Sequence, residues 1–327
     1  MFRPEQFVVA LRAEIGIDVF VEEIAVYLPE VGHTGNISRW HKSVVIRRDE
    51  VIRPGIQPAG SYTSHRSHPA HMTRIAVTGA AGNVGRETLA ALEEYDVTPI
   101  THSEHDDIDG EVCDVTEPAA LSEILAGHDV VVHLAANPSP EADWRSTVDV
   151  NIEGTRNVFE AAREHDIDRV VFASSNHAVG MYNADDPAET ETMVTGHARP
   201  VYPDDPARPD SYYGVSKVTG EALGTYFADR YGIEVVNLRI GWLLSEDELR
   251  ETQTESDEHA RFSRAMWLSS RDCRNAMHAS VSSELPESTV TAHVTSRNDD
   301  RFLSLLESER SLGYRPRDNA SETLEGR

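Results

Sequence analysis

Tyr213 and Lys217, four residues apart, are the residues of this chain best suited to proton transfer. Their spacing predicts that both side chains lie on one face of a helix. A phenol with an ordinary pKa of about 10 is a weak base at neutral pH, but a neighbouring ammonium favours its ionised form. Only two of the 30 basic residues are lysines, Lys217 and Lys42. Because arginine is effectively never deprotonated, a lysine kept at position 217 indicates a chemical role.

The run Ala173-Ser-Ser-Asn-His177 adds hydroxyl groups at the end of a predicted strand. A serine of this run can hold the oxygen of a substrate while the tyrosine removes its proton. Taken singly, each residue also has an ordinary explanation, such as a tyrosine on a helix surface or a serine in a turn. Taken together, they indicate acid–base chemistry at one site.

Glycines at positions 79, 82 and 85 form a turn in the run Thr78-Gly-Ala-Ala-Gly-Asn-Val-Gly85, directly after a predicted strand. This spacing allows a tight turn, a close approach of the backbone to a pyrophosphate and close packing of the following helix, whose N-terminus faces the anion. Alone, a glycine-rich turn is weak evidence. Its place after the first strand of an alternating chain predicts a dinucleotide-binding site.

The choice between NAD and NADP stays open. The second strand of such a fold usually ends in an acid that binds the ribose diol of NAD, but here His102 occupies that place. No arginine is present there to bind the 2′-phosphate of NADP. Asp114, after the third strand, either binds the adenine amino group or is simply an exposed carboxylate at a strand end.

Short β-branched segments alternate with amphipathic ones after Met72. Strands are predicted at 75–78, 97–101, 112–115, 130–134, 170–173 and 235–239, and helices at 83–94, 118–125, 148–165 and 212–231. Nearly continuous apolar strands separated by helices indicate a parallel sheet covered on both faces. With right-handed crossovers, the predicted fold is α/β, a Rossmann-type doubly wound parallel sheet. Residues 183–210, rich in proline and acids, are predicted to form a long loop.

Charge divides the chain at Met72. The 56 acidic and 30 basic residues give a net charge of −26, yet residues 1–71 carry no net charge. We expect 1–71 to be a non-native or disordered N-terminal extension. Residues 72–240 are expected to form the dinucleotide-binding domain, and 241–327 a small substrate-binding lobe that completes the same domain. A genuine small domain at 1–71 is the alternative.

The negative charge argues against nucleic acid as a partner, since phosphate backbones need basic grooves. Such a charge is typical of proteins from a salt-rich cytoplasm, where screening weakens self-repulsion, so a halophilic source is expected. Charged residues interrupt the most apolar N-terminal stretch, 7–28, and neither a membrane span nor a signal peptide is predicted. Cys113 and Cys273 are too few for a disulfide framework and lack metal-ligand spacing. We expect a cytoplasmic protein without a metal.

From Met72 to about Leu324, the chain resembles the extended short-chain dehydrogenases/reductases of the NAD-dependent epimerase/dehydratase group. Six segments are similar to uronate dehydrogenases and to haloarchaeal aldose and glucose-6-phosphate dehydrogenases: 173–180, 206–210, 213–217, 239–241, 266–272 and 313–319. The sequence Ser-Ser-Asn-His in the first segment is the most specific. Epimerases and dehydratases usually continue differently after the serines.

The resemblance implies that Tyr213 is the base, that Lys217 orients the nicotinamide ribose and lowers the tyrosine pKa, and that Ser175 binds the reacting hydroxyl. The implied reaction oxidises a cyclic aldose, uronic acid or sugar phosphate at its anomeric carbon, with hydride passing to NAD or NADP and a lactone leaving. The implied cofactor contacts are Gly79, Gly82, Asn83, Val84, Gly85, His102, Asp114, Val115, Leu134, Ala135, Ala136, Asn151, Tyr213 and Lys217. The implied substrate contacts are Ser139, Ser175, Asn176, His177, Trp242 and Arg264. The family also implies a homodimer or higher homo-oligomer through the helix at 212–231.

Two positions leave the sugar open. Trp242 stands where uronate dehydrogenases usually have a small polar residue, and it either stacks on a sugar face or packs in the core. Arg264 is displaced by one position from the arginine that binds the uronate carboxylate, and Arg261 is an alternative. A neutral pentose or hexose, or a sugar phosphate bound by Arg264, therefore stands beside a uronate as substrate. The alternative functions are a nucleotide-sugar epimerase or dehydratase and a non-catalytic dinucleotide-sensing regulator.

Overall fold

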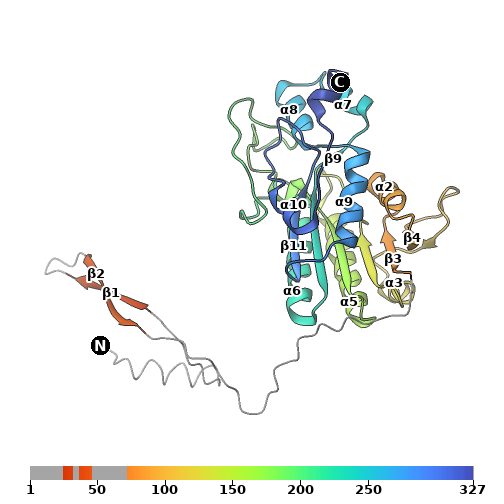
Figure 1. The fold of residues 1–327 in the computed structure, drawn as a ribbon, viewed down its shortest axis with the longest axis horizontal. Helices are drawn as coiled ribbons and strands as arrows, with labels where there is room; N and C mark the ends of the chain where they lie inside the picture. The colour runs from red at the N-terminus through yellow and green to blue at the C-terminus, as the bar shows by residue number, and fades with distance from the viewer. Residues whose placement is uncertain (1–24, 32–36, 46–71, 327) are drawn as a thin grey trace, which may run out of the picture. The chain divides into compact units, whose positions relative to one another are not determined.

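A computed structural model describes residues 25–31, 37–45 and 72–326 of the chain (Figure 1). The chain divides into two units between Pro69 and Ala70, and each is described by itself. In the first unit, β1 (Ala25–Val31) and β2 (Ile37–Val45) pair in antiparallel orientation. The rest of 1–71 lies outside the described residues, so the expected non-native or disordered extension stays a prediction.

Within residues 72–326, seven parallel strands form one sheet. They are β3 (Arg74–Thr78), β4 (Asp96–Thr101), β5 (Glu111–Val112), β6 (Val130–His133), β7 (Arg169–Ser175), β8 (Glu234–Ile240) and β11 (Thr289–Val294). Their spatial order is β11-β8-β7-β6-β3-β4-β5, so the chain builds first toward one edge and then toward the other. The predicted Rossmann-type doubly wound sheet is confirmed. In such sheets, ligands bind beyond the carboxyl ends of the strands where the order reverses, here between β3 and β6.

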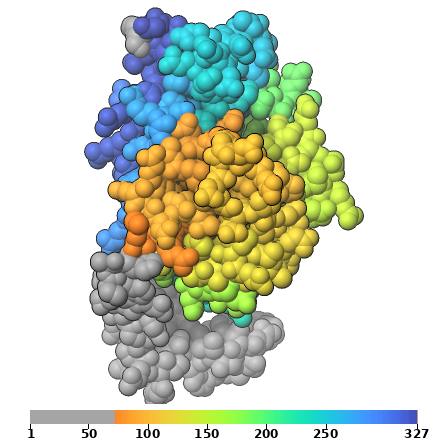
Figure 2. All heavy atoms as spheres, turned by 90° about the vertical axis from the view of Figure 1, so that its right-hand side faces the viewer, coloured from red at the N-terminus to blue at the C-terminus, as the bar shows by residue number. Residues whose placement is uncertain are grey.

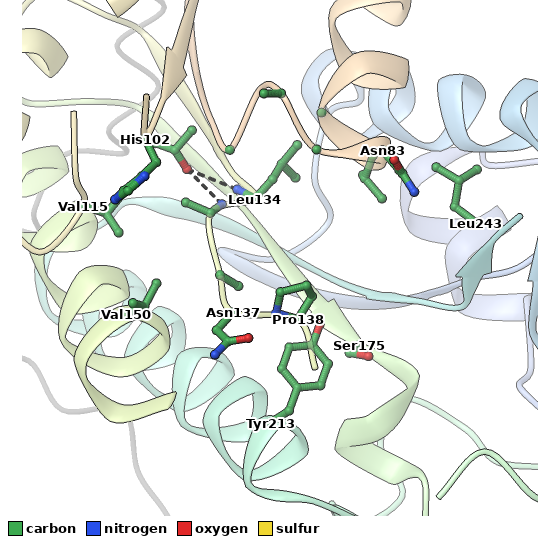
Figure 3. A pocket seen from close by; sticks show the side chains of 18 of the residues that line it. Asn83, His102, Val115, Leu134, Asn137, Pro138, Val150, Ser175, Tyr213 and Leu243 are labelled. Carbon is green, nitrogen blue, oxygen red and sulfur yellow. Dashed lines mark hydrogen bonds between the residues drawn. The ribbon is translucent and has the colours of Figure 1, made fainter. Parts of the chain in front are cut away.

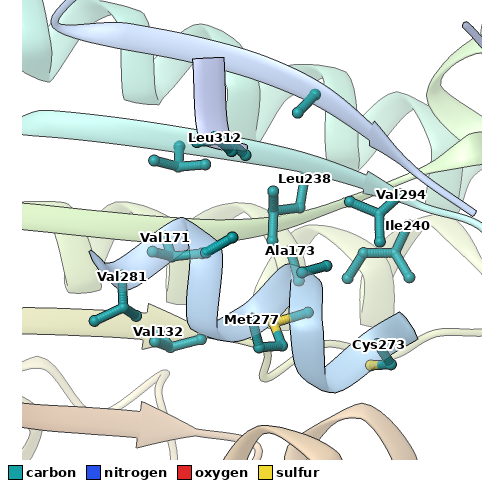
Figure 4. Close-up of a cluster of buried hydrophobic side chains, with 14 of the residues drawn as sticks. Val132, Val171, Ala173, Leu238, Ile240, Cys273, Met277, Val281, Val294 and Leu312 are labelled. Atoms are coloured by element: carbon teal, nitrogen blue, oxygen red, sulfur yellow. The ribbon is translucent and has the colours of Figure 1, made fainter. Parts of the chain in front are cut away.

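Alternating strand residues build a separate core on each face of the sheet. In β6, Val130 and Val132 belong to one core and Val131 to the other. The first core is closed by α2 (Asn83–Ala91) and α9 (Ser270–Ser282), and Figure 4 shows Met277 of α9 among the valines of the strands. The second is closed by α3 (Pro118–Leu125), α5 (Thr155–Glu164) and α6 (Tyr212–Tyr231). Because both faces are covered, the middle of the central strands is mainly apolar, as in the runs at 130–132 and 170–172.

Helix α6, which carries the Tyr–Lys pair, has clear local signals at both ends. The Ser211 hydroxyl accepts the backbone N–H of Gly214 at 3.0 Å and caps the first turn. Gly232 ends the helix with φ of 77°, a left-handed conformation that glycine adopts without strain. The prediction of a helix at 212–231 is confirmed.

Three predicted boundaries differ from the structure by three or more residues, each because of a local polar contact or turn. The helix predicted at 83–94 ends at Ala91, where the chain turns and the Tyr95 N–H bonds to Leu92 O. The strand predicted at 112–115 ends at Val112, because the Asp114 carboxylate accepts the N–H of Thr116 and forms a turn.

The helix predicted at 148–165 begins four residues earlier. Asp143 accepts the N–H groups of Arg145 and Ser146 and so starts α4 (Trp144–Thr147). A π-helical segment η1 (Val148–Gly154) then leads into α5. Such wide turns are frequent at functional sites, and this one carries Asn151.

Residues after Gly241 contribute to two parts of the fold. Strand β11 forms one edge of the sheet, and helix α9 covers one of its faces. Helix α10 (Leu306–Leu312) packs on β11. The smaller part consists of β9 (Trp242–Leu243), α7 (Glu246–Thr252), α8 (Asp257–Met266), β10 (Trp267–Leu268) and α11 (Ala320–Leu324). In Figure 2 its cyan to light-blue atoms lie above the orange and yellow segments that follow residue 72.

The predicted loop at 183–210 packs against the smaller part. Met193 is fully buried, and its N–H bonds to Glu258 O at 3.2 Å. In the described part of the chain, no helix has the length and apolarity needed to cross a bilayer.

Candidate active site

A cleft of about 820 Å³ opens at the carboxyl ends of the strands. Its lining comes from the ends of β3, β4, β6, β7 and β8 and from the smaller part of the fold. In Figure 3, His102 and Val115 lie toward one end of the cavity, and Ser175 and Tyr213 lie together elsewhere in it. This is the size and position expected for a ligand site in a doubly wound sheet.

The glycine turn after β3 forms one wall of the cleft. Gly79 has φ of 70°, and a Cβ there would lie 2.7 Å from the backbone N of Ala135. A Cβ at Gly82, by contrast, would meet only Gly79 O at 3.4 Å, so the packing of the protein itself leaves this position open. Helix α2 begins there with no side-chain cap on its N-terminal N–H groups. The turn therefore fits a pyrophosphate approaching the helix N-terminus, as predicted for Gly79 to Gly85.

At the far end of the cleft, His102 and Asp114 face each other. The His102 Nε2 lies 3.5 Å from an Asp114 carboxylate oxygen, and the imidazole side chain is 81% exposed. Hydrogen bonds from Thr116 hold the pKa of Asp114 below its ordinary value. The end of β4 thus offers a histidine paired with an ionised carboxylate that itself lines the cleft.

The middle of the cleft is apolar and its backbone is firmly held. The Thr78 hydroxyl accepts the N–H groups of Leu134 and Ala135 at 3.2 and 3.3 Å (Figure 3). The predicted cofactor contacts Leu134, Ala135 and Ala136 line the cleft here, and Val115 lines it beside His102. Asn151 lies behind it: its carboxamide bonds both backbone groups of Asn137 and the Ser216 hydroxyl, so it joins the loop after β6 to α6.

Tyr213 and Ser175 line the reacting end of the cleft, with Lys217 directly behind them. The Lys217 ammonium donates to Ala173 O at 2.7 Å and lies 5.4 Å from the centre of the Tyr213 ring. The Ser175 hydroxyl donates to Asn176 Oδ1 and accepts the His177 N–H, both at 3.2 Å. The predicted triad is therefore brought together by the end of β7 and the first turns of α6.

Burial sets the acidity of this triad. Desolvation raises the pKa of Tyr213 to about 12, although a hydrogen bond with Ser175 opposes the rise. Desolvation also lowers the pKa of Lys217 to about 7, since no carboxylate within residues 72–326 pairs with its ammonium. Burial thus determines the pKa of Tyr213 in this structure, and the lowering by lysine that the resemblance implies is not among its causes.

His177 lies between two carboxylates. Its Nδ1 is 2.9 Å from an Asp210 oxygen, and its Nε2 is 3.7 Å from a Glu191 oxygen. Burial alone would lower the pKa of His177, but the hydrogen bonds and charges of Asp210 and Glu191 raise it to about 9. The imidazole is therefore a cation at neutral pH, beside Asn176 in the cleft lining.

The remaining predicted substrate contacts differ in placement. Trp242 lines the cleft and packs edge-on against His259, with ring centres 5.7 Å apart. Arg264 does not line it, because its guanidinium donates to Asp300 at 2.8 Å and to Gln253 at 2.7 Å. Ser139 also lies outside the lining, with its hydroxyl accepting the Glu141 N–H.

Sequence reasoning missed Glu191 and Asp210. Asp210 ends the segment 206–210 that carried part of the family resemblance and precedes the cap of α6, so a signal existed. Glu191 lies in a loop without periodicity, and nothing in the local sequence marks it. Its place in the cleft lining follows from long-range packing.

Known proteins similar to this chain include sugar dehydrogenases. The model of the NAD dependent epimerase/dehydratase family matches residues 75–268. L-arabinose 1-dehydrogenase (NAD(P)(+)) of Haloferax volcanii is 57% identical over 78% of this chain and 100% of its own length. NAD-dependent glucose-6-phosphate dehydrogenase of the same organism is 36% identical over 77% of this chain and 96% of its length. The expected halophilic character agrees with these relatives.

Solved structures support the same relationship. Uronate dehydrogenase from Agrobacterium tumefaciens is 30% identical, with a TM-score of 0.63 over 78% of this chain and 88% of that chain. The chain thus combines sequence similarity to these sugar dehydrogenases with a glycine turn, a Ser–Tyr–Lys cluster and a doubly wound sheet. The chain belongs to the NAD-dependent epimerase/dehydratase family of extended short-chain dehydrogenases/reductases.

Proposed function

We propose that this enzyme oxidises a neutral cyclic aldose at its anomeric carbon. The proposed sugar is similar in size to L-arabinose, the substrate named for its Haloferax volcanii relative. The protein is an NAD(P)-dependent sugar 1-dehydrogenase, and the product is the corresponding lactone. A neutral pentose is the specific proposal. The identity of 57% over the whole length of the L-arabinose enzyme supports it.

Each residue at the reacting end has a proposed task. Ser175 holds the anomeric oxygen, and Tyr213 takes the proton of its hydroxyl as the carbonyl forms. The glycine turn at 79–85 and the apolar middle of the cleft would hold a nicotinamide cofactor, which would supply the acceptor for the hydride of the anomeric carbon. The phenolate is unfavourable in the ligand-free site, so Lys217, whose lowered pKa lets it gain or lose a proton near neutrality, supports proton transfer from behind the tyrosine. Asn176 and His177 bind other sugar hydroxyls.

The observation that carries the choice of a neutral sugar is the charge of the cleft. Among the described residues, its lining contains no lysine and no arginine. The arginine expected to read a carboxylate or phosphate, Arg264, is paired with Asp300 and Gln253. The cation that the lining does contain, His177, is already paired with Asp210 and faces Glu191.

A substrate panel tests the proposal. Protein in concentrated KCl is assayed for reduced-nicotinamide absorbance with NAD and NADP against neutral pentoses and hexoses, uronic acids and sugar phosphates. Neutral aldoses should give the highest kcat/KM, and the product should be a lactone. A preference for uronates or phosphates would refute the neutral substrate. Absence of turnover, with cofactor binding retained, would favour an epimerase or a dinucleotide sensor.

Three further expectations stay part of this proposal. The enzyme acts in the cytoplasm, and it forms a homodimer or higher oligomer through α6. Residues 1–71 are an extension that the activity does not need, so protein beginning at Met72 should be fully active.

A further inference from the structure

We propose that Glu191 selects neutral sugars by accepting a hydrogen bond from a sugar hydroxyl and by repelling sugars that carry a carboxylate or phosphate. This inference rests on the proposed function and names the residue that sets its substrate class. It concerns a side chain from the long loop at 183–210 and not one of the motifs that carry the family resemblance.

Glu191 is the carboxylate that faces both the cleft and the imidazole of His177. Its side chain is 28% exposed, lines the cleft and places one oxygen 3.7 Å from His177 Nε2. That distance is too long for a good hydrogen bond, so the carboxylate keeps most of its capacity to accept one from a ligand. A bond from a neutral hydroxyl to an ionised carboxylate is among the stronger hydrogen bonds.

The position of Glu191 is fixed by the surrounding loop. Its φ of 62° is a left-handed conformation, which is strained for a residue with a side chain. Contacts two and three residues later hold it: Met193 is buried with its N–H bonded to Glu258 O, and the Val194 N–H bonds to Asn183 O. Arg261 also donates to Val194 O and, at 2.5 Å, to Gly196 O. The loop thus maintains a strained conformation that points a carboxylate into the cleft.

Asp210 already supplies the counter-charge that His177 needs. It lies 2.9 Å from Nδ1, is 7% exposed and accepts the Ser211 hydroxyl at 2.8 Å. A Cβ at Gly180 would overlap its carboxylate at 1.8 Å, so the lack of a side chain there leaves room for Asp210. Two carboxylates around one imidazolium leave one negative charge in excess. Because Asp210 is the closer partner of the imidazolium, the excess charge belongs to Glu191, which lines the cleft.

An acidic sugar would place a second negative charge beside this excess. Like charges brought together in a partly desolvated site disfavour binding strongly, and such repulsion is a common source of specificity. A residue that merely supported His177 would affect neutral and acidic sugars equally. The ratio of kcat/KM for a neutral sugar to kcat/KM for an acidic sugar therefore distinguishes a role of Glu191 in substrate selection from a role in supporting His177.

The test is the Glu191→Gln variant, which keeps size and one acceptor but removes the charge. The kcat/KM for a neutral aldose should fall about tenfold or more, because a bond to a charged acceptor is lost. The kcat/KM for the matching uronic acid should rise, so that their ratio falls about 100-fold. Glu189→Gln is the matched control, since Glu189 is an exposed acid of the same loop two residues earlier. Its ratio should equal that of the wild type.

An unchanged ratio in Glu191→Gln, in protein that binds cofactor normally, would overturn the inference. If the glutamine variant does not fold, Glu191→Asp keeps the charge but withdraws it by one methylene. The ratio should then fall by a smaller factor, and an unchanged ratio counts equally against the inference. Failure of the proposed function looks different, because the wild type itself would then oxidise no sugar or prefer acidic ones.

Discussion

Two buried nitrogen bases lie close to the ring of Tyr213 and differ in their partners. Lys217 is 3% exposed, and within residues 72–326 its ammonium donates a hydrogen bond to the carbonyl of Ala173 alone; burial lowers its pKa to about 7. His177 is 6% exposed, with its ring centre 5.6 Å from that of Tyr213. Despite the burial, Asp210 and Glu191 raise its pKa to about 9.

The difference shows that partners, and not depth, decide which base carries a charge here. A base with a pKa near the working pH can exchange a proton during a reaction, whereas a base held as a cation can bind but not exchange. The site is thus divided into a side for proton transfer, with Lys217, and a side for binding, with His177. Tyr213 lies close to both bases.

The largest expected effect comes from removing Lys217, the base without a carboxylate partner. Lys217→Met should lower kcat/KM by about 10²–10⁴, the usual contribution of a positioned acid–base group. Thermal stability below pH 7 should not fall much, because an unpaired buried cation is lost along with one hydrogen bond. Steady-state kinetics and thermal unfolding measure both quantities.

Arg230→Met is the control, since it removes an exposed base at the far end of the same helix and should leave kcat/KM unchanged. If Lys217→Met were fully active, the division between the two bases would be wrong. A loss of folding together with activity would give Lys217 a structural role.

A smaller effect concerns the pH dependence of stability in the ligand-free protein. The pKa of His177 rises from 6.5 to about 9 on folding, so its stabilisation is complete below pH 6.5 and is lost as pH rises to 9. The pKa of Lys217 falls from 10.5 to about 7, so its contribution improves as pH rises from 7 to 10.5. Between pH 7 and 9 the two trends oppose each other, and the unfolding free energy of the wild type should change little.

Single variants should separate these trends. In His177→Asn the unfolding free energy should rise with pH by up to about 1.4 kcal/mol per unit between pH 7 and 9, and in Lys217→Met it should fall. Denaturant unfolding at pH 7, 8 and 9 in concentrated KCl measures these slopes. Equal slopes in both variants would show that the two bases do not differ as described.

The smallest effect is expected at Arg264, outside the cleft lining. Arg264→Gln should change kcat/KM for neutral aldoses by less than about twofold, and the loss of its partly exposed pair with Asp300 should cost about 0–1 kcal/mol of stability. The ratio of aldose to uronate activity should stay constant. A selective loss of uronate or phosphate turnover would restore Arg264 as an anion-binding residue.

Local signals explain what the sequence allowed us to predict. The cap at Ser211 and the glycine at 232 fix α6, and the spacing of Tyr213 and Lys217 then follows from helix geometry. The glycine turn is likewise recognised from the spacing of three glycines within the seven residues 79–85. These features need no knowledge of distant contacts.

Long-range packing explains what could not be predicted. Arg264 is diverted by Asp300, 36 positions away. Glu191 reaches the cleft because its loop is anchored to α8, which no periodicity in 183–210 reveals. The high pKa of Tyr213 depends on how deeply the folded chain buries it, a quantity that spacing alone does not give.

The central claim, oxidation of a neutral sugar at its anomeric carbon, is tested most directly by following the hydrogen on that carbon. The enzyme is incubated with NAD or NADP and a neutral aldose that carries deuterium at the anomeric position. The reduced cofactor is then recovered, and its mass is measured by mass spectrometry. We predict that the deuterium appears in the reduced nicotinamide together with a lactone product. Reduced cofactor without deuterium, or deuterium retained in the sugar product, would contradict the account.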